Sequence, residues 1–264
     1  MKTIDVEAIR KNAVEVHEKD AAWFANEYGN NSSFYSSAFL YGRFQFMKLI
    51  DEQTATLSKD SRILDIGCGT GDLLSKLQKK GFVNLVGIEP AANMRTIAQN
   101  NLGEEVVVDG SAVMLPFEDN SFDFITAIEV LRYLAPEDNL QAFKEIYRVL
   151  KPGGMFLGTF VNLWALDGFC FLMFFRKLWH FLGGNRPRCT VKFDTPTGLT
   201  RTLAGIGFSR IETHGAMIAI LRIIWKLLGN KTSIIAMKVE PIDARLTRKW
   251  GKAFAGHLVC VATK

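Results

Sequence analysis

A glycine-rich turn between a short apolar run and an amphipathic segment constrains this fold more than any other feature. Residues 62–66 (Arg-Ile-Leu-Asp-Ile) predict a buried strand, Gly67, Gly69 and Gly71 follow at every second position, and a helix is expected from Asp72. A strand, a glycine turn and a helix N-terminus together present bare backbone N–H groups to a ligand. The spacing is Gly-x-Gly-x-Gly, which is neither the dinucleotide pattern Gly-x-Gly-x-x-Gly nor a P-loop.

The segments that follow alternate between strand and helix patterns, which is typical of a mostly parallel sheet. Strands are expected at residues 62–66, 85–89, 106–109, 122–128, 155–161, 208–213 and 256–263, and helices at about 72–80, 91–101, 137–150 and 196–206. The last strand should pair antiparallel with the strand at 208–213. The predicted fold class is α/β, a doubly wound, mostly parallel seven-stranded sheet with a helical N-terminal extension and helical insertions after the fifth and sixth strands.

The length of 264 residues and the 48% hydrophobic content suit one large α/β domain. We expect an N-terminal helical lid segment at 1–58 and the main domain at 59–264, with insertions at about 162–196 and 216–254 that form an apolar, basic cap. The charged N-terminus predicts no signal peptide. The four cysteines form no Cys-x-x-Cys pair, so a zinc site or disulfide framework is not expected and a reducing, cytoplasmic setting is.

Carboxylates follow the ends of four successive predicted strands. They are Asp65, Glu89, Asp109 and Glu129. In a doubly wound sheet, ligands bind at the carboxyl ends of the strands, and four like charges around one crevice disfavour a polyphosphate. They suit a ligand that carries a ribose, an exocyclic amine, an ammonium group and a cationic centre, as S-adenosylmethionine does.

Five longer segments give the chain a family resemblance. It resembles the class I S-adenosylmethionine-dependent methyltransferases, in particular those of ubiquinone and menaquinone biosynthesis. The resemblance covers residues 60–160 well and 197–264 loosely. The matching segments are LDIGCGTGDL (64–73), VGIEP (86–90) with Asn93-Met94, DGSAVMLPF (109–117), FDFITAIEVLRYL (122–134) and EIYRVLKPGGMFLGTF (145–160).

The resemblance implies which residues hold each part of the cofactor. Glu89 would bind both ribose hydroxyls, and Asp109 would accept a hydrogen bond from the adenine amine. The residues implied around the ribose and adenine are Glu89, Pro90, Met94, Asp109, Gly110 and Ser111. The residues implied around the methionine end are Arg43, Asp65, Gly67, Cys68, Gly69, Ala127 and Ile128. For Arg43 the alternative is a place at the solvent margin of a helix that packs on the sheet edge.

The resemblance implies methyl transfer by in-line displacement, in which the protein mainly positions the acceptor. A base is needed only if the acceptor must lose a proton. Where the family often has Glu-His after the fourth strand, this chain has Arg132-Tyr133. The remaining catalytic candidates are Tyr133, His180 and His214, of which His214 should stand at a strand end, while His257 is expected to be structural. No His/Asp/Glu spacing suggests a metal.

The two insertions bear on the acceptor. Residues 162–264 hold 16 Lys and Arg against five Asp and Glu, and residues 168–175 (GFCFLMFF) are too short for a bilayer span of about 20 residues. Two alternatives stay open: an ordinary lid, or a lid whose segments 164–182 and 217–228 also touch a membrane interface, with Trp164, Trp179 and Trp225 at headgroup level. Either alternative favours a small apolar or amphiphilic acceptor. The expected location is the cytoplasm, and in the second alternative the protein would be peripheral at the inner face of the membrane.

Other classes of protein fit less well. A nicotinamide-dependent dehydrogenase would have the other glycine spacing. A nucleic-acid partner is not favoured, because the aromatic–basic patterns of single-strand readers are missing and no Asn-Pro-Pro-Tyr tetrapeptide follows the fourth strand. A methyltransferase that acts on RNA or protein, and a non-catalytic module that binds S-adenosylmethionine or its product S-adenosylhomocysteine, remain alternatives. The oligomeric state is left open.

Overall fold

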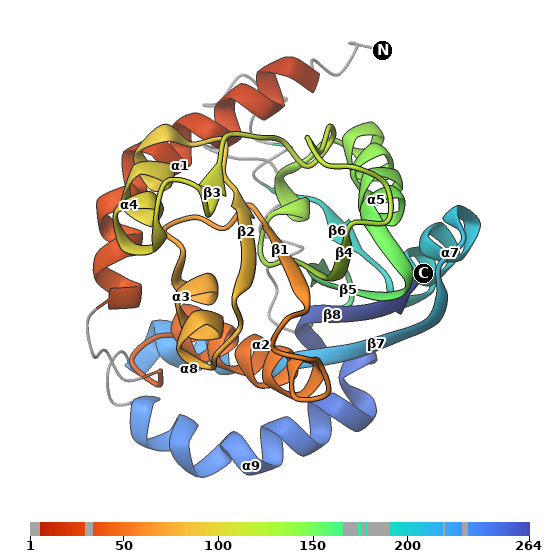
Figure 1. Ribbon diagram of the computed structural model, residues 1–264. Coiled ribbons are helices and arrows are strands. Elements are labelled where there is room, and N and C mark those ends of the chain that lie inside the picture. The colour runs from red at the N-terminus through yellow and green to blue at the C-terminus, as the bar shows by residue number, and fades with distance from the viewer. Residues whose placement is uncertain are drawn as a thin grey trace.

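The computed structural model describes residues 6–29, 34–165, 174–175, 178, 191–218, 220–228 and 232–264. In this part of the chain one sheet runs through the molecule in the strand order β3-β2-β1-β4-β5-β8-β7, and the short β6 pairs with β5 (Figure 1). All pairings are parallel except those of β8, which is antiparallel to both β5 and β7. The predicted α/β class, the mostly parallel sheet and the antiparallel last strand are therefore confirmed.

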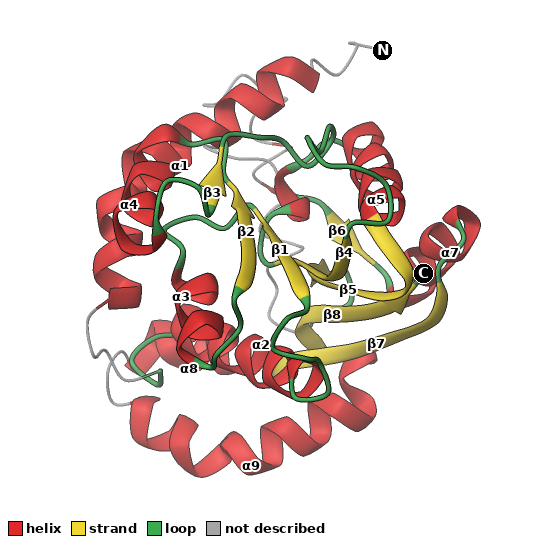
Figure 2. Cartoon of the chain, in the orientation of Figure 1, coloured by secondary structure: helices red, strands yellow, loops and turns green. Residues whose placement is uncertain are grey.

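The elements follow the alternation seen in the sequence (Figure 2). The strands are β1 (Arg62–Ile66), β2 (Asn84–Ile88), β3 (Val107–Val108), β4 (Phe122–Ala127), β5 (Leu150–Asn162), β6 (Phe193–Asp194), β7 (Ser209–Ile218) and β8 (Ala255–Thr263). The helices are α1 (Val6–Gly29), α2 (Ala38–Thr54), α3 (Asp72–Lys79), α4 (Ala92–Leu102), α5 (Pro136–Val149), α7 (Pro196–Ile206), α8 (Ile220–Leu228) and α9 (Thr232–Trp250), with short 3₁₀ turns at Leu131–Tyr133 and Gly251–Ala253.

Two apolar clusters cover the faces of the sheet. One joins α5 and α7 to the sheet through side chains such as Phe143 and Leu203, and the other joins α2, α3 and α4 through side chains such as Phe46 and Leu74. Figure 1 shows these two groups of helices on opposite sides of the strands. The central strands are buried on both faces, which is why they read as continuous apolar runs.

The strand at 208–213 is longer than its sequence pattern indicates. β7 continues to Ile218, so His214 lies inside the strand, opposite Val259 of β8, and not at its end. Gly215 allows the continuation because a Cβ there would come 2.5 Å from the Cα of Gly251. The glycine serves a close approach of two backbones, as glycine inside a strand often does.

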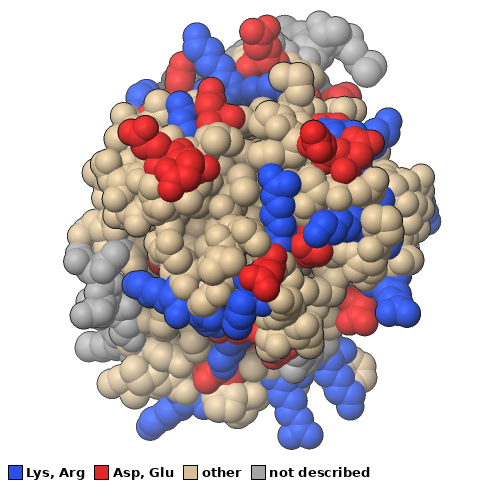
Figure 3. Space-filling model, in the orientation of Figure 1, with Lys and Arg blue, Asp and Glu red and all other residues tan. Residues whose placement is uncertain are grey.

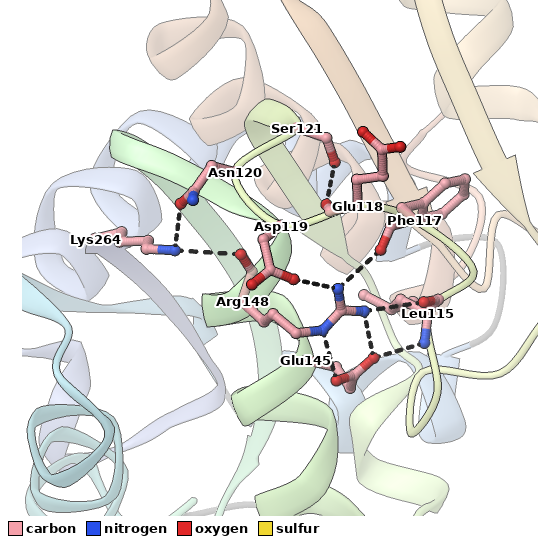
Figure 4. Close-up of polar contacts among 9 residues, drawn as sticks. All are labelled: Leu115, Phe117, Glu118, Asp119, Asn120, Ser121, Glu145, Arg148 and Lys264. Carbon is pink, nitrogen blue, oxygen red and sulfur yellow. Dashed lines mark hydrogen bonds and ion pairs between the residues drawn. The ribbon is translucent and has the colours of Figure 1, made fainter.

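One arginine fixes the long loop between β3 and β4 (Figure 4). Arg148 of α5 donates to the carbonyls of Leu115 and Phe117 at 3.0 and 2.8 Å, to Asp119 at 2.8 Å, and to both carboxylate oxygens of Glu145. These hydrogen bonds hold the pKa of Glu145 below its ordinary value, although burial opposes them. Because residues 109–111 open this loop, Arg148 helps to place a segment of the predicted site.

The helices outside the central alternation pack in two places. α1 runs beside α4, and α2, α8 and α9 lie together near β7 (Figure 1). Trp225 of α8, which the membrane-contact alternative places at headgroup level, is buried with its ring centre 5.5 Å from that of Tyr41 in α2. None of the helices in the described part of the chain has both the length and the apolar character needed to cross a membrane.

Candidate functional site

The glycine turn joins β1 to α3 and is tied to the end of β2. Gly67, Gly69 and Gly71 all have positive φ, at 66°, 56° and 81°. The N–H groups of Gly67 and Cys68 donate to the carbonyl of Ile88 at 2.8 and 3.0 Å. A Cβ on Gly67 would overlap Cγ2 of Val130, so this turn needs glycine both for its conformation and for its space.

Glu89 lies directly against this turn. One of its carboxylate oxygens accepts from the N–H of Gly69 at 2.8 Å and the other from the N–H of Ala91 at 2.9 Å. Burial raises the pKa of Glu89, and the two backbone donors partly oppose that rise. Since an ionised carboxylate can accept about four hydrogen bonds, Glu89 keeps acceptor capacity for a pair of ligand hydroxyls.

Asp65 is the second buried acid of the turn. The hydroxyl of Thr126 donates to its Oδ1 at 2.7 Å. Burial raises the pKa of Asp65 to about 7, and the Thr126 hydrogen bond and the charge of Arg43 offset only part of the effect. A ligand ammonium group beside Asp65 would favour its ionised form.

Arg43 approaches the same glycine turn from α2. Its Nη2 donates to Asp72 at 2.9 Å, and its guanidinium lies 4.1 Å from the ring centre of Tyr28 in α1. The buried Nε of Arg43 has no hydrogen-bond partner in the part of the chain that the structure describes. Arg43 is thus held inside the protein and not at a solvent margin, and it retains a donor that a ligand carboxylate can use.

Met94 and Cys68 complete the inner side of the turn. Both are buried, and a Cβ on Gly69 would come 3.7 Å from Sδ of Met94, so α4 packs directly on the turn. Burial raises the pKa of the Cys68 thiol well above its ordinary value. Cys68 therefore acts here as a small apolar side chain.

Asp109 is less enclosed than the other acids. Its side chain is 73% exposed and pairs with Nη1 of Arg95 at 3.1 Å. The same nitrogen donates to the carbonyls of Glu89 and Pro90 at 2.6 and 3.2 Å. Arg95 therefore ties the end of β2 to the residues after β3, a role that the sequence did not predict. The only local signal for it is a cation one helical turn into α4.

The other residues predicted around the adenine and the amino-acid end also lie along these strand ends. Gly110 lies against Ile88, because a Cβ there would come 3.4 Å from the isoleucine side chain. Ser111 forms an isolated bridge with Met114. Ala127 is buried at the end of β4, and Ile128 packs on the α2–α3–α4 side of the core.

Helix α1 is fastened to the starts of α4 and α5. Glu18 accepts from the N–H groups of Ala92 and Asn93 at the start of α4, the second at 2.9 Å. Arg10 forms an ion pair with Asp138 at the start of α5. These contacts fasten α1 across the ends of the strands, and neither has a signal in the local sequence because each joins distant elements.

A second polar cluster lies beyond β4. Glu129 has a positive φ of 64°, which is uncommon for a residue other than glycine and tends to occur at functional sites. Its Oε1 accepts from Nη1 of Arg132 at 2.9 Å and lies 3.4 Å from Nε2 of His257. Arg132 also donates to the hydroxyl of Tyr133 at 2.9 Å.

This cluster changes the set of catalytic candidates. Tyr133 belongs to it, with its ring centre 5.0 Å from that of His17 in α1. His214 does not, because it lies within β7 beside the exposed Glu212, at 3.5 Å. His180 falls outside the described residues. His257, expected to be structural, brings an imidazole to Glu129, since its register opposite Val161 places it near the carboxyl end of β5.

The described residues contain no group of three or more His, Cys, Asp or Glu side chains that could hold a metal ion. The arrangement is instead one of buried acids, a buried guanidinium and bare backbone around one turn. Such a site can bind a ligand that has hydroxyls, an ammonium group and a carboxylate.

Comparisons with known proteins match this chain to methyltransferases. A family model described as a methyltransferase domain matches residues 64–158. A demethylmenaquinone methyltransferase of Lactiplantibacillus plantarum is 42% identical over 107 residues, which are 37% of this chain and 44% of that protein. A sterol 24-C-methyltransferase of Schizosaccharomyces pombe is 34% identical over 149 residues, 52% of this chain and 39% of that protein.

These matches span less than half the length of each relative. Among solved structures, a Thermotoga maritima protein described as a methyltransferase dependent on S-adenosylmethionine and a possible histamine N-methyltransferase aligns with a TM-score of 0.60 and 20% identity. The alignment covers 95% of this chain and 99% of that one. At this identity the likeness shows the fold alone.

Proposed function

We propose that this chain, a class I S-adenosylmethionine-dependent methyltransferase by its domain and its fold, binds S-adenosylmethionine at the glycine turn and transfers the methyl group to a small apolar or amphiphilic acceptor. The product would be S-adenosylhomocysteine. The observation that carries the proposal is the pair of buried acids, Asp65 and Glu89, that meet at one glycine turn. Two buried carboxylates select against phosphates and for a ligand with hydroxyls and an ammonium group.

Each residue of the site then has a role in binding. Glu89 accepts from the ribose hydroxyls while the N–H groups of Gly69 and Ala91 hold it in place. Asp65 binds the ammonium group, and Arg43 binds the carboxylate through the donor that it has not used. The bound cofactor supplies an activated methyl group, so the protein's main task is to position the acceptor and exclude water.

The cluster around Glu129 fits the acceptor side of this site. His257 and Glu129 together provide a base for an acceptor that must lose a proton, with the imidazole Nε2 3.4 Å from the carboxylate. Tyr133 packs with Val161, Val191 and Phe193, which give this side an apolar wall. An apolar wall beside a small polar cluster suits an amphiphilic acceptor.

The names of the relatives support an acceptor of this class. One relative is named for demethylmenaquinone and the other for a sterol. The two matches cover only 37% and 52% of this chain. The acceptor itself is therefore inferred from the apolar wall around Tyr133 and from the apolar residues Leu163 and Trp164 that stand exposed after β5.

Calorimetry with S-adenosylhomocysteine tests the cofactor site. Glu89→Ala should weaken binding by about 1–3 kcal/mol, because charge-assisted hydrogen bonds to the ribose are lost, which is roughly 5- to 150-fold in Kd. Glu104→Ala, a change of an exposed acid just beyond α4, is the matched control and should leave binding unchanged. Equal affinity of the Glu89 variant and the wild type would refute the site.

Turnover of labelled cofactor with a panel of lipophilic, sugar and amino-acid acceptors tests the reaction. Methylation of the lipophilic members is the expected result. Binding of S-adenosylhomocysteine without methylation of any acceptor would favour the non-catalytic binding module instead. His257→Asn should lower kcat for hydroxyl acceptors and flatten the pH profile without changing the affinity for S-adenosylhomocysteine.

A further inference from the structure

Helix α9 sorts its side chains by charge. Its two acids point inward and are engaged: Glu240 pairs with Lys48, and Asp243 accepts from the hydroxyl of Tyr41 at 2.5 Å. Three of its four bases, Lys238, Arg245 and Lys249, are exposed. Charges that merely solvate a surface helix usually include both signs, so a uniformly basic outer surface needs a reason.

Large apolar side chains share this outer surface. Those exposed on α9 are Ile234, Ile235, Met237, Ile242, Leu246 and Trp250. The spacing 235, 242, 246, 250 keeps an apolar stripe along one side of the helix, and 238, 245, 249 keeps a basic stripe directly beside it. We call the two stripes together the outer face of α9. Leu227 and Leu228, exposed at the end of α8, extend its apolar part.

The outer face lies at the boundary of the molecule. Figure 1 shows α9 at the lower edge of the molecule, below α8 and α2, and the lower margin of the surface in Figure 3, where α9 lies, carries projecting Lys and Arg side chains. The inner side of α9 is already packed, because Ala236, Asp243 and Thr247 are buried. The side chains of the apolar stripe remain 37–60% exposed, and this exposed part is available to a partner.

The chemistry of this face fits an anionic lipid surface. Amphipathic helices that lie in a membrane interface combine an apolar face with Lys and Arg, and Trp favours the headgroup level. Lys249 lies 5.6 Å from the ring centre of Trp250, which brings a cation and an interfacial aromatic residue to one point. Lysine is depleted at protein–protein interfaces, so two lysines beside the stripe favour lipid headgroups over a protein.

We propose that the outer face of α9 docks on membranes that contain anionic lipid, with Ile242, Leu246 and Trp250 entering the interface and Lys238, Arg245 and Lys249 at the phosphates. This partner is independent of the proposed methyl transfer. It also differs from the membrane contact expected from residues 217–228, whose Leu221 and Trp225 are buried. The helix lies on the membrane and does not cross it.

Vesicle flotation tests the proposal. The full chain should bind vesicles of 70% phosphatidylcholine and 30% phosphatidylglycerol, and bind pure phosphatidylcholine at least tenfold less. The triple change Lys238→Glu, Arg245→Glu and Lys249→Glu should lower binding to the anionic vesicles at least tenfold, because each base near such a surface contributes about 1 kcal/mol. The triple change Lys79→Glu, Lys144→Glu and Arg201→Glu, at exposed residues of α3, α5 and α7, is the charge control, which removes the same net charge and should bind like the wild type.

A second variant separates apolar insertion from simple charge attraction. Ile242→Ser with Leu246→Ser keeps every charge and should still lower binding severalfold, with more of the remaining binding removed by 0.5 M salt. Retained affinity for S-adenosylhomocysteine verifies that each variant is folded. The proposal would be overturned if the chain failed to bind anionic vesicles, or if the charge control lost as much binding as the α9 variant. It would also be overturned by a salt-resistant dimer that Ile242→Ser with Leu246→Ser abolishes, because that result would assign the face to a second copy of the chain.

Discussion

The turn at Gly67 makes a quantitative prediction about stability. Gly67→Ala places a methyl group on a residue with φ of 66° and against the side chain of Val130, whose Cγ1 would lie 3.1 Å away. The left-handed conformation costs an L-residue about 1–2 kcal/mol, and overpacking adds about 1–3 kcal/mol. The free energy of unfolding should therefore fall by about 2–5 kcal/mol.

Gly153 supplies the matched control for this change. Its φ is 78°, similar to that of Gly67, but an added Cβ there would meet nothing within 4 Å. Gly153→Ala should therefore show the conformational cost alone, about 1–2 kcal/mol. Equilibrium unfolding in urea measures both values, provided that the slope with denaturant stays the same.

Val130→Ala completes a double-mutant cycle with Gly67→Ala. The smaller side chain makes room for the new methyl group, so the double variant should be more stable than the sum of the single changes predicts by about 1–2 kcal/mol. A cost for Gly67→Ala within about 0.5 kcal/mol of that for Gly153→Ala, or simple additivity in the cycle, would refute the steric part of this reasoning.

Three further predictions concern the site and its supports. Burial raises the pKa of Asp65 to about 7. The stability that its protonated form contributes is therefore complete below its ordinary pKa of about 3.9 and is lost as the pH rises toward 7. Calorimetry should show that the affinity for S-adenosylmethionine increases from pH 6 to 8, and Asp65→Asn should remove that pH dependence. Arg148→Lys should lower the free energy of unfolding by about 2–3 kcal/mol. Lys151→Ala, which breaks one ion pair with Asp123, should lower it by less than about 1 kcal/mol. Equal losses of the two variants in urea unfolding would contradict this prediction. Glu18→Ala, which frees the start of α4 from α1, should speed dissociation of S-adenosylhomocysteine severalfold in stopped-flow measurements, and an unchanged rate would show that α1 is not a lid.

Local signals were enough to predict most of the fold. The bounds of β1 at 62–66 and of α7 at 196–206 agree with the sequence pattern residue for residue. Apolar runs, glycine and proline act within a few residues of themselves, so they can be read without tertiary information. The predicted end of the strand at residue 213 was wrong. Gly215 locally favours the end of a strand, but here it allows a close approach to the backbone of Gly251, and the strand continues.

Some residues of the candidate site could be predicted from local sequence signals, and others could not. The acids at the strand ends were predictable, because each follows an apolar run and parallel strands end at one edge. Arg95 and Glu18 were not, because their partners are chosen by packing: Glu18 caps a helix whose first residue is 74 positions away. The role of His257 depends on the register between β5 and β8, and a shift of one residue would turn its side chain to the other face.

The charge asymmetry of the sequence acquires two separate explanations. Residues 1–161 hold 22 Asp and Glu against 16 Lys and Arg, and this acidic excess includes the carboxylates at the strand ends, where we propose that a cationic ligand binds. The basic excess of residues 162–264 includes the outer face of α9, which points away from that site. Helix α2 contacts both regions, since Tyr41 binds Asp243 of α9 and Arg43 binds Asp72 next to the glycine turn. Because one helix carries both contacts two residues apart, a protein docked through α9 would hold Arg43, and with it the methionine end of the proposed cofactor site, at a fixed height above the lipid surface.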